Sequence, residues 1–257
     1  MHKWLISGAG IALALSVPVA AKSALQAPAD VASAVASRDR TADNAKLDPS
    51  RKPAALLAFL GLRKGMQVLD LFGGNLYWSE IIAPAVGQKG HVTIWQPGQF
   101  LTPDGRKKLD GFAAAHLNVS WLTSPFESPN LPVSAYDFAL INLDYHDVYW
   151  ENKERGVVRM DPDAWLKTLY SAMKPGAIVG VVDHAATPGG DTRAVVEKFH
   201  RIDPAVVRRD FRKAGFVLIG TSAMYRNPAD THQVLVFDPA IRGKTDRFVM
   251  KFRKVGR

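Results

Sequence analysis

The sequence of 257 residues contains no cysteine. This absence excludes disulfide bonds, thiolate metal ligands and a cysteine nucleophile, so the stability of the protein must come from an ordinary packed core. With 47% hydrophobic residues, the chain can bury one sizeable core. We therefore expect one domain of the α/β kind with additional terminal segments.

Acidic residues are scarce in the C-terminal part of the chain. The formal net charge is +9, and residues 193–257 carry 15 Lys and Arg against 6 Asp and Glu, whereas the two signs balance in residues 1–192. Such an excess indicates a solvated basic face or, as the alternative, a surface for an anionic partner such as a membrane. We expect no nucleic-acid partner, because an exported protein seldom meets nucleic acid.

Export is expected because the N-terminus has the layout of a secretory signal peptide. His2 and Lys3 precede the apolar run Trp4–Leu15, and small residues follow up to Ala21. The run is shorter than the roughly 20 residues needed to cross a bilayer, which makes an uncleaved membrane anchor the weaker alternative. We predict a signal peptide over residues 1–21 and a periplasmic location.

The remaining chain divides by composition into two parts. Residues 22–50 are rich in Ala, Ser, Asp and Pro, which predicts a linker and a short polar helix. Residues 51–257 form the predicted domain, in which apolar runs alternate with helical patterns. The expected strands of the parallel part are 66–71, 91–95, 119–122, 136–143 and 177–182. This alternation predicts a doubly wound, mostly parallel sheet with helices on both faces.

The end of the predicted domain breaks this alternation. Residues 216–221 and 233–237 are strand candidates, and the turn-rich segment NPAD between them contains no helix. We therefore expect these two strands to pair as an antiparallel hairpin. The last segment, DRFVMKFRKV, is expected to add an edge strand. A parallel sheet closed by such a hairpin differs from an ordinary dinucleotide-binding fold.

A glycine pair follows the first strand in VLDLFGGNLYWSEIIA, residues 68–83. Ligands in such sheets bind where a strand turns into its helix, because the helix N-terminus offers free N–H groups. Asp70 at the strand end, followed by Gly73 and Gly74, resembles the first motif of the class I S-adenosylmethionine-dependent methyltransferases. The phrase MKPGAIVGVVD is also typical of that family. HRIDPAVVRRDFRKAGF and TDRFVMKF resemble a group of exported bacterial proteins described as predicted methyltransferases.

The resemblance implies a Rossmann-like class I methyltransferase fold and S-adenosylmethionine as the cofactor. It places five residues around that cofactor: Asp70, Gly73, Gly74, Asn75 and Gln96. Gln96 ends the second strand, where the family usually has an acidic residue that binds the ribose hydroxyls. Without the resemblance, the glycine pair is explained by a tight strand-to-helix turn that needs no cofactor.

The densest cluster of reactive side chains follows the fourth strand, in INLDYHDVYW. A methyltransferase often needs a base to remove the proton of the acceptor, and the ordinary pKa of His146 suits that role. Asp144 or Asp147 is expected to orient the imidazole ring. The aromatic residues of this segment, Tyr145, Tyr149 and Trp150, are expected to form the wall of an acceptor pocket. The alternative is a polar loop in which His146 caps a helix.

The fifth strand ends in VVDHAATPGGD and lies beside the fourth. Asp144, Asp183 and His184 are therefore candidate ligands of a divalent cation such as Mg²⁺ or Mn²⁺. Catechol-type O-methyltransferases, which this pair of segments resembles distantly, hold their metal after the same two strands. His200 follows a loop that is a candidate lid, or it is a helix-end histidine packed beside Phe199.

Two functions remain open. The first is methyl transfer from S-adenosylmethionine to a small molecule or an envelope component, with His146 as the base. The second is a non-catalytic periplasmic binding protein on the same fold, because Phe72 and Leu76 stand where the family commonly has glycines. The direction of these two side chains distinguishes the hypotheses, since either would block a cofactor if it pointed into the cavity.

Overall fold

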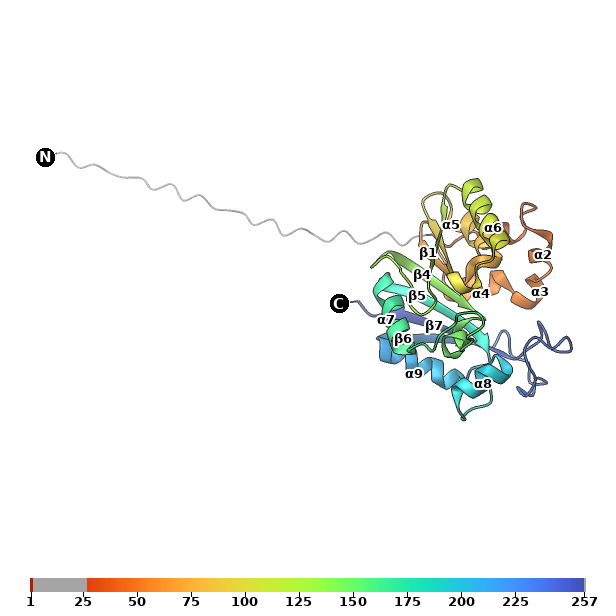
Figure 1. Ribbon diagram of the computed structural model, residues 1–257. Helices are drawn as coiled ribbons and strands as arrows, with labels where there is room; N and C mark the ends of the chain where they lie inside the picture. The colour runs from red at the N-terminus through yellow and green to blue at the C-terminus, as the bar shows by residue number, and fades with distance from the viewer. Residues whose placement is uncertain (2–26, 257) are drawn as a thin grey trace.

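The computed structural model of the chain describes Met1 and residues 27–256 (Figure 1). The predicted signal peptide, residues 1–21, lies outside the described residues apart from Met1. Within the described part, no helix is both long enough and apolar enough to cross a membrane. Export and cleavage therefore stay predictions.

Seven strands form one sheet in the order β3-β2-β1-β4-β5-β7-β6. The strands are β1 (Gln67–Leu71), β2 (His91–Pro97), β3 (Val119–Ser124), β4 (Tyr136–Asn142), β5 (Met173–His184), β6 (Phe216–Ser222) and β7 (Arg247–Lys254). The first five pair in parallel, whereas β7 runs antiparallel to both β5 and β6. The expected fold class is confirmed, and the strand order reverses between β1 and β4, which opens a crevice at the carboxyl ends of these strands.

The predicted C-terminal hairpin was wrong in its second strand. Residues 233–237 form no strand but an irregular segment with one bend and one turn, and Leu235 and Phe237 are 40% and 53% exposed. The partner of β6 is instead β7, which lies between β5 and β6 rather than at the edge. Phe248, Val249 and Met250 on β7 are all at least nine-tenths buried, since both faces of this strand are covered. Burial on two faces selects the more continuous apolar run.

Helices cover both faces of the sheet (Figure 1). The helices are α1 (Val31–Val35), α2 (Ala42–Ala45), α3 (Asp48–Arg51), α4 (Pro53–Leu60), α5 (Ser79–Val86), α6 (Pro103–Ala115), α7 (Pro162–Ala172), α8 (Thr192–Phe199) and α9 (Pro204–Ala214). Buried side chains of α1, α4, α5 and α6 form one core, and those of α7, α8 and α9 form the other. Asp161 caps α7 through the N–H of Asp163, as its position before Pro162 predicts.

Residues 27–50 pack against the rest of the domain, so this part of the predicted linker is folded. Val31 and Ala34 of α1 are buried in the core beneath α4 and α5. The guanidinium of Arg40 donates two hydrogen bonds to the carboxylate of Asp48, at 2.6 and 2.8 Å. The hydroxyl of Tyr77, just after the glycine loop, donates to the same carboxylate at 2.7 Å. These contacts place α3 against the loop that follows β1.

Candidate functional site

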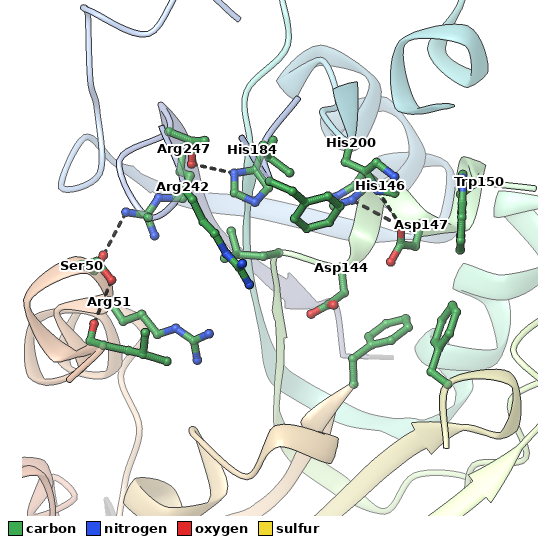
Figure 2. A pocket seen from close by; sticks show the side chains of 18 of the residues that line it. Ser50, Arg51, Asp144, His146, Asp147, Trp150, His184, His200, Arg242 and Arg247 are labelled. Carbon is green, nitrogen blue, oxygen red and sulfur yellow. Dashed lines mark hydrogen bonds and ion pairs between the residues drawn. The ribbon is translucent and has the colours of Figure 1, made fainter. Parts of the chain in front are cut away.

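A cavity of about 770 Å³ opens at the carboxyl ends of β1, β2, β4 and β5. Its volume lies within the roughly 300–1,000 Å³ of small-molecule and cofactor sites. The walls also include the end of α3 and the segment between β6 and β7, residues 236–247 (Figure 2). We call this space the central cavity. Its position is where ligands bind in open α/β sheets.

Asp70 lies behind the glycine loop and not in the wall of the central cavity. Its side chain is 1% exposed and accepts a hydrogen bond from the hydroxyl of Ser79 at 2.5 Å. Burial raises the pKa of Asp70 to about 7, although the Ser79 hydrogen bond and Arg51 oppose that rise. A Cβ atom on Gly73 would lie 2.7 Å from the Asp70 carboxylate. The buried carboxylate of Asp70 therefore packs against the glycine loop. Gly73 permits this close contact because it has no side chain.

Gln96 is the predicted cofactor residue that does line the central cavity. Its amide oxygen accepts a hydrogen bond from the backbone N–H of Gly74 at 3.0 Å. Because a Cβ on Gly74 would lie 2.5 Å from that oxygen, only glycine fits here without displacement of Gln96. Asn75 is exposed and accepts from the N–H of Tyr77 at 2.9 Å, so it stabilises the turn. Gly73, Gly74 and Asn75 do not line the cavity.

Phe72 and Leu76 flank the short helix η1 (Gly73–Asn75) and both adopt left-handed backbone conformations, with φ of 59° and 65°. Leu76 is 9% exposed and packs into the core on the side of α5. Phe72 is 8% exposed and packs edge-on against Trp95 and Phe126, with ring centroids 5.2 and 5.3 Å apart. The ring of Phe72 borders the cavity without filling it. Neither side chain therefore blocks the cavity.

His146 lies in η3 (Tyr145–Tyr149), directly after β4, and is 3% exposed. Its Nδ1 lies 2.8 Å from Oδ1 of Asp183, and its Nε2 lies 3.3 Å from Oδ1 of Asp147. Burial alone lowers the pKa of His146, but Asp183, Asp147 and Asp144 outweigh burial and raise it to about 9. Without a further ligand, the imidazole therefore keeps its second proton at neutral pH.

The expected aromatic wall is formed in part. Tyr145 and Tyr149 point away from the cavity and donate hydrogen bonds to the buried Asp210 of α9, at 3.0 and 2.5 Å. These bonds fix η3 against α9. Trp150 lines the cavity, as expected. The sequence shows that three aromatic residues are neighbours, but only the packing of η3 decides which of them face the central cavity.

The predicted metal ligands Asp144, Asp183 and His184 are not assembled as a ligand set, and this prediction is corrected. Both oxygens of Asp183 already accept hydrogen bonds, from the ring and backbone N–H of His146 and from the backbone N–H of His184. Nδ1 of His184 lies 2.7 Å from the hydroxyl of Thr245. Asp144 lines the cavity, where burial raises its pKa well above the ordinary value.

A different group of candidate ligands comes together. His146, Asp147 and His200 each offer one ligand atom, and these atoms lie within 4.8 Å of one another. His200 is the C-cap of α8 and stands at the helix end, as the sequence suggests, but its ring also lines the cavity. Its ring centroid lies 5.4 Å from that of His146. Only the tertiary structure brings residue 200 to the end of β4.

Sequence reasoning missed three arginines, Arg51, Arg242 and Arg247, which we call the arginine wall. They lie on the opposite side of the cavity from His146 and His200 in Figure 2. Within the described part of the chain, none of the three makes an ion pair. Nη1 of Arg51 and Nε of Arg247 are buried without a hydrogen-bond partner. The C-terminal excess of basic residues was the available signal for Arg242 and Arg247.

Comparisons with known proteins give the same fold. No family model matches the chain. The ubiquinone/menaquinone biosynthesis C-methyltransferase UbiE of Pasteurella multocida is 25% identical over 171 residues, which cover 66% of this chain and 57% of that protein. UbiE of Psychromonas ingrahamii is 29% identical over 48% of this chain and 44% of that protein. The chain thus spans about half the length of the curated relatives it matches.

Among solved structures, a SAM-dependent methyltransferase from Aquifex aeolicus matches with a TM-score of 0.55 and 21% identity, over 84% of this chain and 100% of that one. The chain has a class I methyltransferase fold. At 21% identity, the likeness to this SAM-dependent protein concerns the fold. The [4+2]-cyclase SpnF matches with a TM-score of 0.59 and 14% identity, over 91% of this chain and 88% of that one. A methyltransferase fold therefore does not by itself establish methyl transfer.

Proposed function

We propose that this protein transfers a methyl group from S-adenosylmethionine to an anionic small molecule bound in the central cavity. The observation that carries the proposal is the arginine wall, which faces a cavity at the expected cofactor position of a methyltransferase fold. Three guanidinium groups that form no ion pair with a described residue favour a ligand that supplies negative charge. Arginine is well suited to this task, because its planar fork binds carboxylate and phosphate groups.

The residues present fit the cofactor. Arg51 has a buried Nη1 without a partner, which is the donor that the carboxylate of a methionine moiety would take. Gln96 is held by Gly74 at the end of β2, where its amide can meet a ribose hydroxyl. Phe72, Phe100 and Trp150 supply apolar wall for a purine base. S-adenosylmethionine, when bound, supplies an electrophilic methyl group.

Arg242 and Arg247 are the residues that we assign to the acceptor. Arg247 is 6% exposed and is held by a hydrogen bond from its Nη2 to the carbonyl of Ser50 at 2.9 Å. Its guanidinium also stacks on Tyr225, 4.6 Å from the ring centroid. Arg242 is exposed and comes from the segment between β6 and β7. A fixed guanidinium and an exposed one together would orient an acidic acceptor and exclude neutral ones.

The role of His146 as a general base stays a prediction, and it requires that the imidazole first lose its second proton. An imidazole whose pKa is about 9 binds its second proton at pH 7 and has no lone pair free to accept another. His146 would act as a base only at a pH high enough to remove that proton. Asp183 holds the ring in either case, through Nδ1.

The alternative is a non-catalytic binding protein on the same fold, and the match to a cyclase makes it relevant. The arginine wall fits either function. A periplasmic location, and contact of the basic C-terminal region with anionic lipid, stay predictions in both cases. Binding of the cofactor is the property that separates the two hypotheses.

Isothermal titration of the full chain with S-adenosylmethionine and S-adenosylhomocysteine tests the proposal. We expect saturable binding of both compounds, and Arg51→Gln should weaken it about tenfold or more, because a hydrogen bond between charged groups contributes about 1.5–3 kcal/mol. Arg38→Ala, at an exposed arginine outside the cavity, is the matched control and should leave affinity unchanged. Absence of binding by the folded wild type would refute the methyltransferase and leave the binding protein.

A second assay concerns the acceptor. Transfer of a labelled methyl group is measured with pairs of small acceptors that differ only in a carboxylate or phosphate group. Arg242→Ala should raise the KM for the charged member of each pair and leave the neutral member unaffected. Equal effects on both members would contradict the assignment of Arg242 to an anionic group.

A further inference from the structure

Two histidines and one carboxylate meet on the wall opposite the arginine wall. His146 and Asp147 come from η3, and His200 comes from the end of α8 (Figure 2). Oδ1 of Asp147 lies 3.3 Å from Nε2 of His146 and 3.7 Å from Nδ1 of His200. All three residues line the central cavity, so the group is enclosed by protein on one side and accessible on the other.

The spacing fits three ligands of one metal ion. Two atoms that each lie about 2.1 Å from a metal at a tetrahedral angle are about 3.4 Å apart. The two distances to Asp147 already bracket this value, and the three ligand atoms lie within 4.8 Å of one another.

An unsatisfied atom points independently to a ligand. Oδ1 of Asp147 is buried and has no hydrogen-bond partner among the described residues. A buried carboxylate oxygen without a partner carries a desolvation cost of about 1–3 kcal/mol or more. Both neighbouring imidazoles face this oxygen without a well-formed hydrogen bond to it. A cation between the three groups would satisfy Asp147 and both rings.

The support behind His146 is also that of a metal ligand. Asp183 lies 2.8 Å from Nδ1 of His146 and also accepts the backbone N–H of His146 at 2.9 Å. A histidine that binds a metal usually donates its other ring N–H to a carboxylate in this way, which fixes the tautomer and the ring orientation. Asp183 therefore directs the Nε2 lone pair toward Asp147 and His200.

We propose that His146, Asp147 and His200 bind one divalent transition-metal ion such as Zn²⁺. Two imidazole nitrogens and one carboxylate oxygen favour Zn²⁺, Fe²⁺ or Co²⁺ over Mg²⁺ and Ca²⁺, which prefer oxygen ligands. The remaining coordination positions face the cavity, where an oxygen of the acceptor can bind. There the ion would lower the pKa of an acceptor hydroxyl, and this last role rests on the proposed function.

Metal binding and the general-base role exclude each other at His146. A cation on Nε2 takes the lone pair that a base would use, and it replaces the Nε2 proton, which faces Asp147. Without a metal, the same geometry is explained by a protonated imidazole between carboxylates. The two explanations predict opposite results in a metal titration.

The test uses the untagged full chain after treatment with a chelator. Zn²⁺ binding is measured by isothermal titration, and Co²⁺ binding by visible absorption, which also reports the ligand geometry. We expect one ion per chain, and a loss of tenfold or more in affinity for Asp147→Asn and for His200→Gln. Asp183→Asn should weaken binding about 10- to 100-fold through the orientation of His146. His116→Gln removes an imidazole that does not line the cavity, at the C-terminal end of α6, and is the matched control.

Circular dichroism of each variant confirms that it is folded. No saturable binding of Zn²⁺ or Co²⁺ by the wild type would overturn the proposal, as would binding that survives both Asp147→Asn and His200→Gln. The titration is performed without S-adenosylmethionine, and cofactor binding is measured separately with the chelator present. Failure of the metal site and failure of the methyltransferase are thus distinguishable.

Discussion

Replacing Asp70 with Asn removes a carboxyl group that is buried in the core beside the glycine loop. Burial raises the pKa of Asp70 from 3.8 to about 7, so the folded protein binds this proton more tightly than the unfolded chain does. The free energy of unfolding therefore falls as the pH rises from about 4 to about 7, and this contribution is constant at higher pH. The shift of about 3 pKa units corresponds to at most about 4 kcal/mol.

The Asn variant keeps an acceptor for the Ser79 hydroxyl but carries no charge at any pH. We expect wild type and Asp70→Asn to have similar stability near pH 4, and the variant to be more stable above pH 7. The difference should reach about 2–4 kcal/mol, because the net shift of about 3 pKa units sets its upper limit. Urea unfolding followed by tryptophan fluorescence at pH 4 to 9 measures it.

Ser79→Ala is the matched control, because Ser79 donates the hydrogen bond that stabilises the ionised carboxylate. In the wild type, Ser79→Ala should lower the free energy of unfolding more at pH 8 than at pH 4. In the Asp70→Asn variant, Ser79→Ala should lower it by the same amount at both pH values. A stability difference between wild type and Asp70→Asn that does not change from pH 4 to 9 would refute the reasoning. Asp70 would then not titrate with a raised pKa.

Three further substitutions test the packing of the protein by urea unfolding. Gly74→Ala places a Cβ 2.5 Å from the amide oxygen of Gln96 and should cost about 1–3 kcal/mol. Gly111→Ala, in an open position on α6, should instead stabilise by up to about 1 kcal/mol, and equal effects would contradict the steric argument. Asp230→Ala leaves the charge of the fully buried Arg201 without its partner and should cost about 3–5 kcal/mol. A loss below 1 kcal/mol would mean that Arg201 finds water or another acceptor.

The periodicity of the sequence was sufficient for the fold class and for the position of the central cavity. Five parallel strands and their helices follow from alternating apolar runs, because each run must bury its apolar face against the next layer. The caps of α7 and α4 were also predictable, since Asp161 before Pro162 and Gly61 after an apolar stretch act locally. The similarity to methyltransferases agrees with this local information.

The partner of β6 was not predictable from local pattern. Residues 233–237 and 247–254 both have strand propensity. The second segment forms the strand because its apolar side chains pack into both hydrophobic cores of the protein. The burial of a segment on both faces is a property of the assembled layers. Helix α1 also packs into the core through Val31 and Ala34, although the composition of residues 22–50 is that of a linker.

The sequence by itself determined which reactive residues follow β4 and β5, and where the glycine loop stands. Only the tertiary structure decided their roles: it placed Asp70 under the loop, used Asp183 to hold His146, and brought His200 from α8 to Asp147. It also gathered Arg51 with Arg247, 196 positions later, on one wall. Spacing along the chain indicates which strand end a residue occupies, whereas side-chain direction and long-range contact depend on how the completed layers pack.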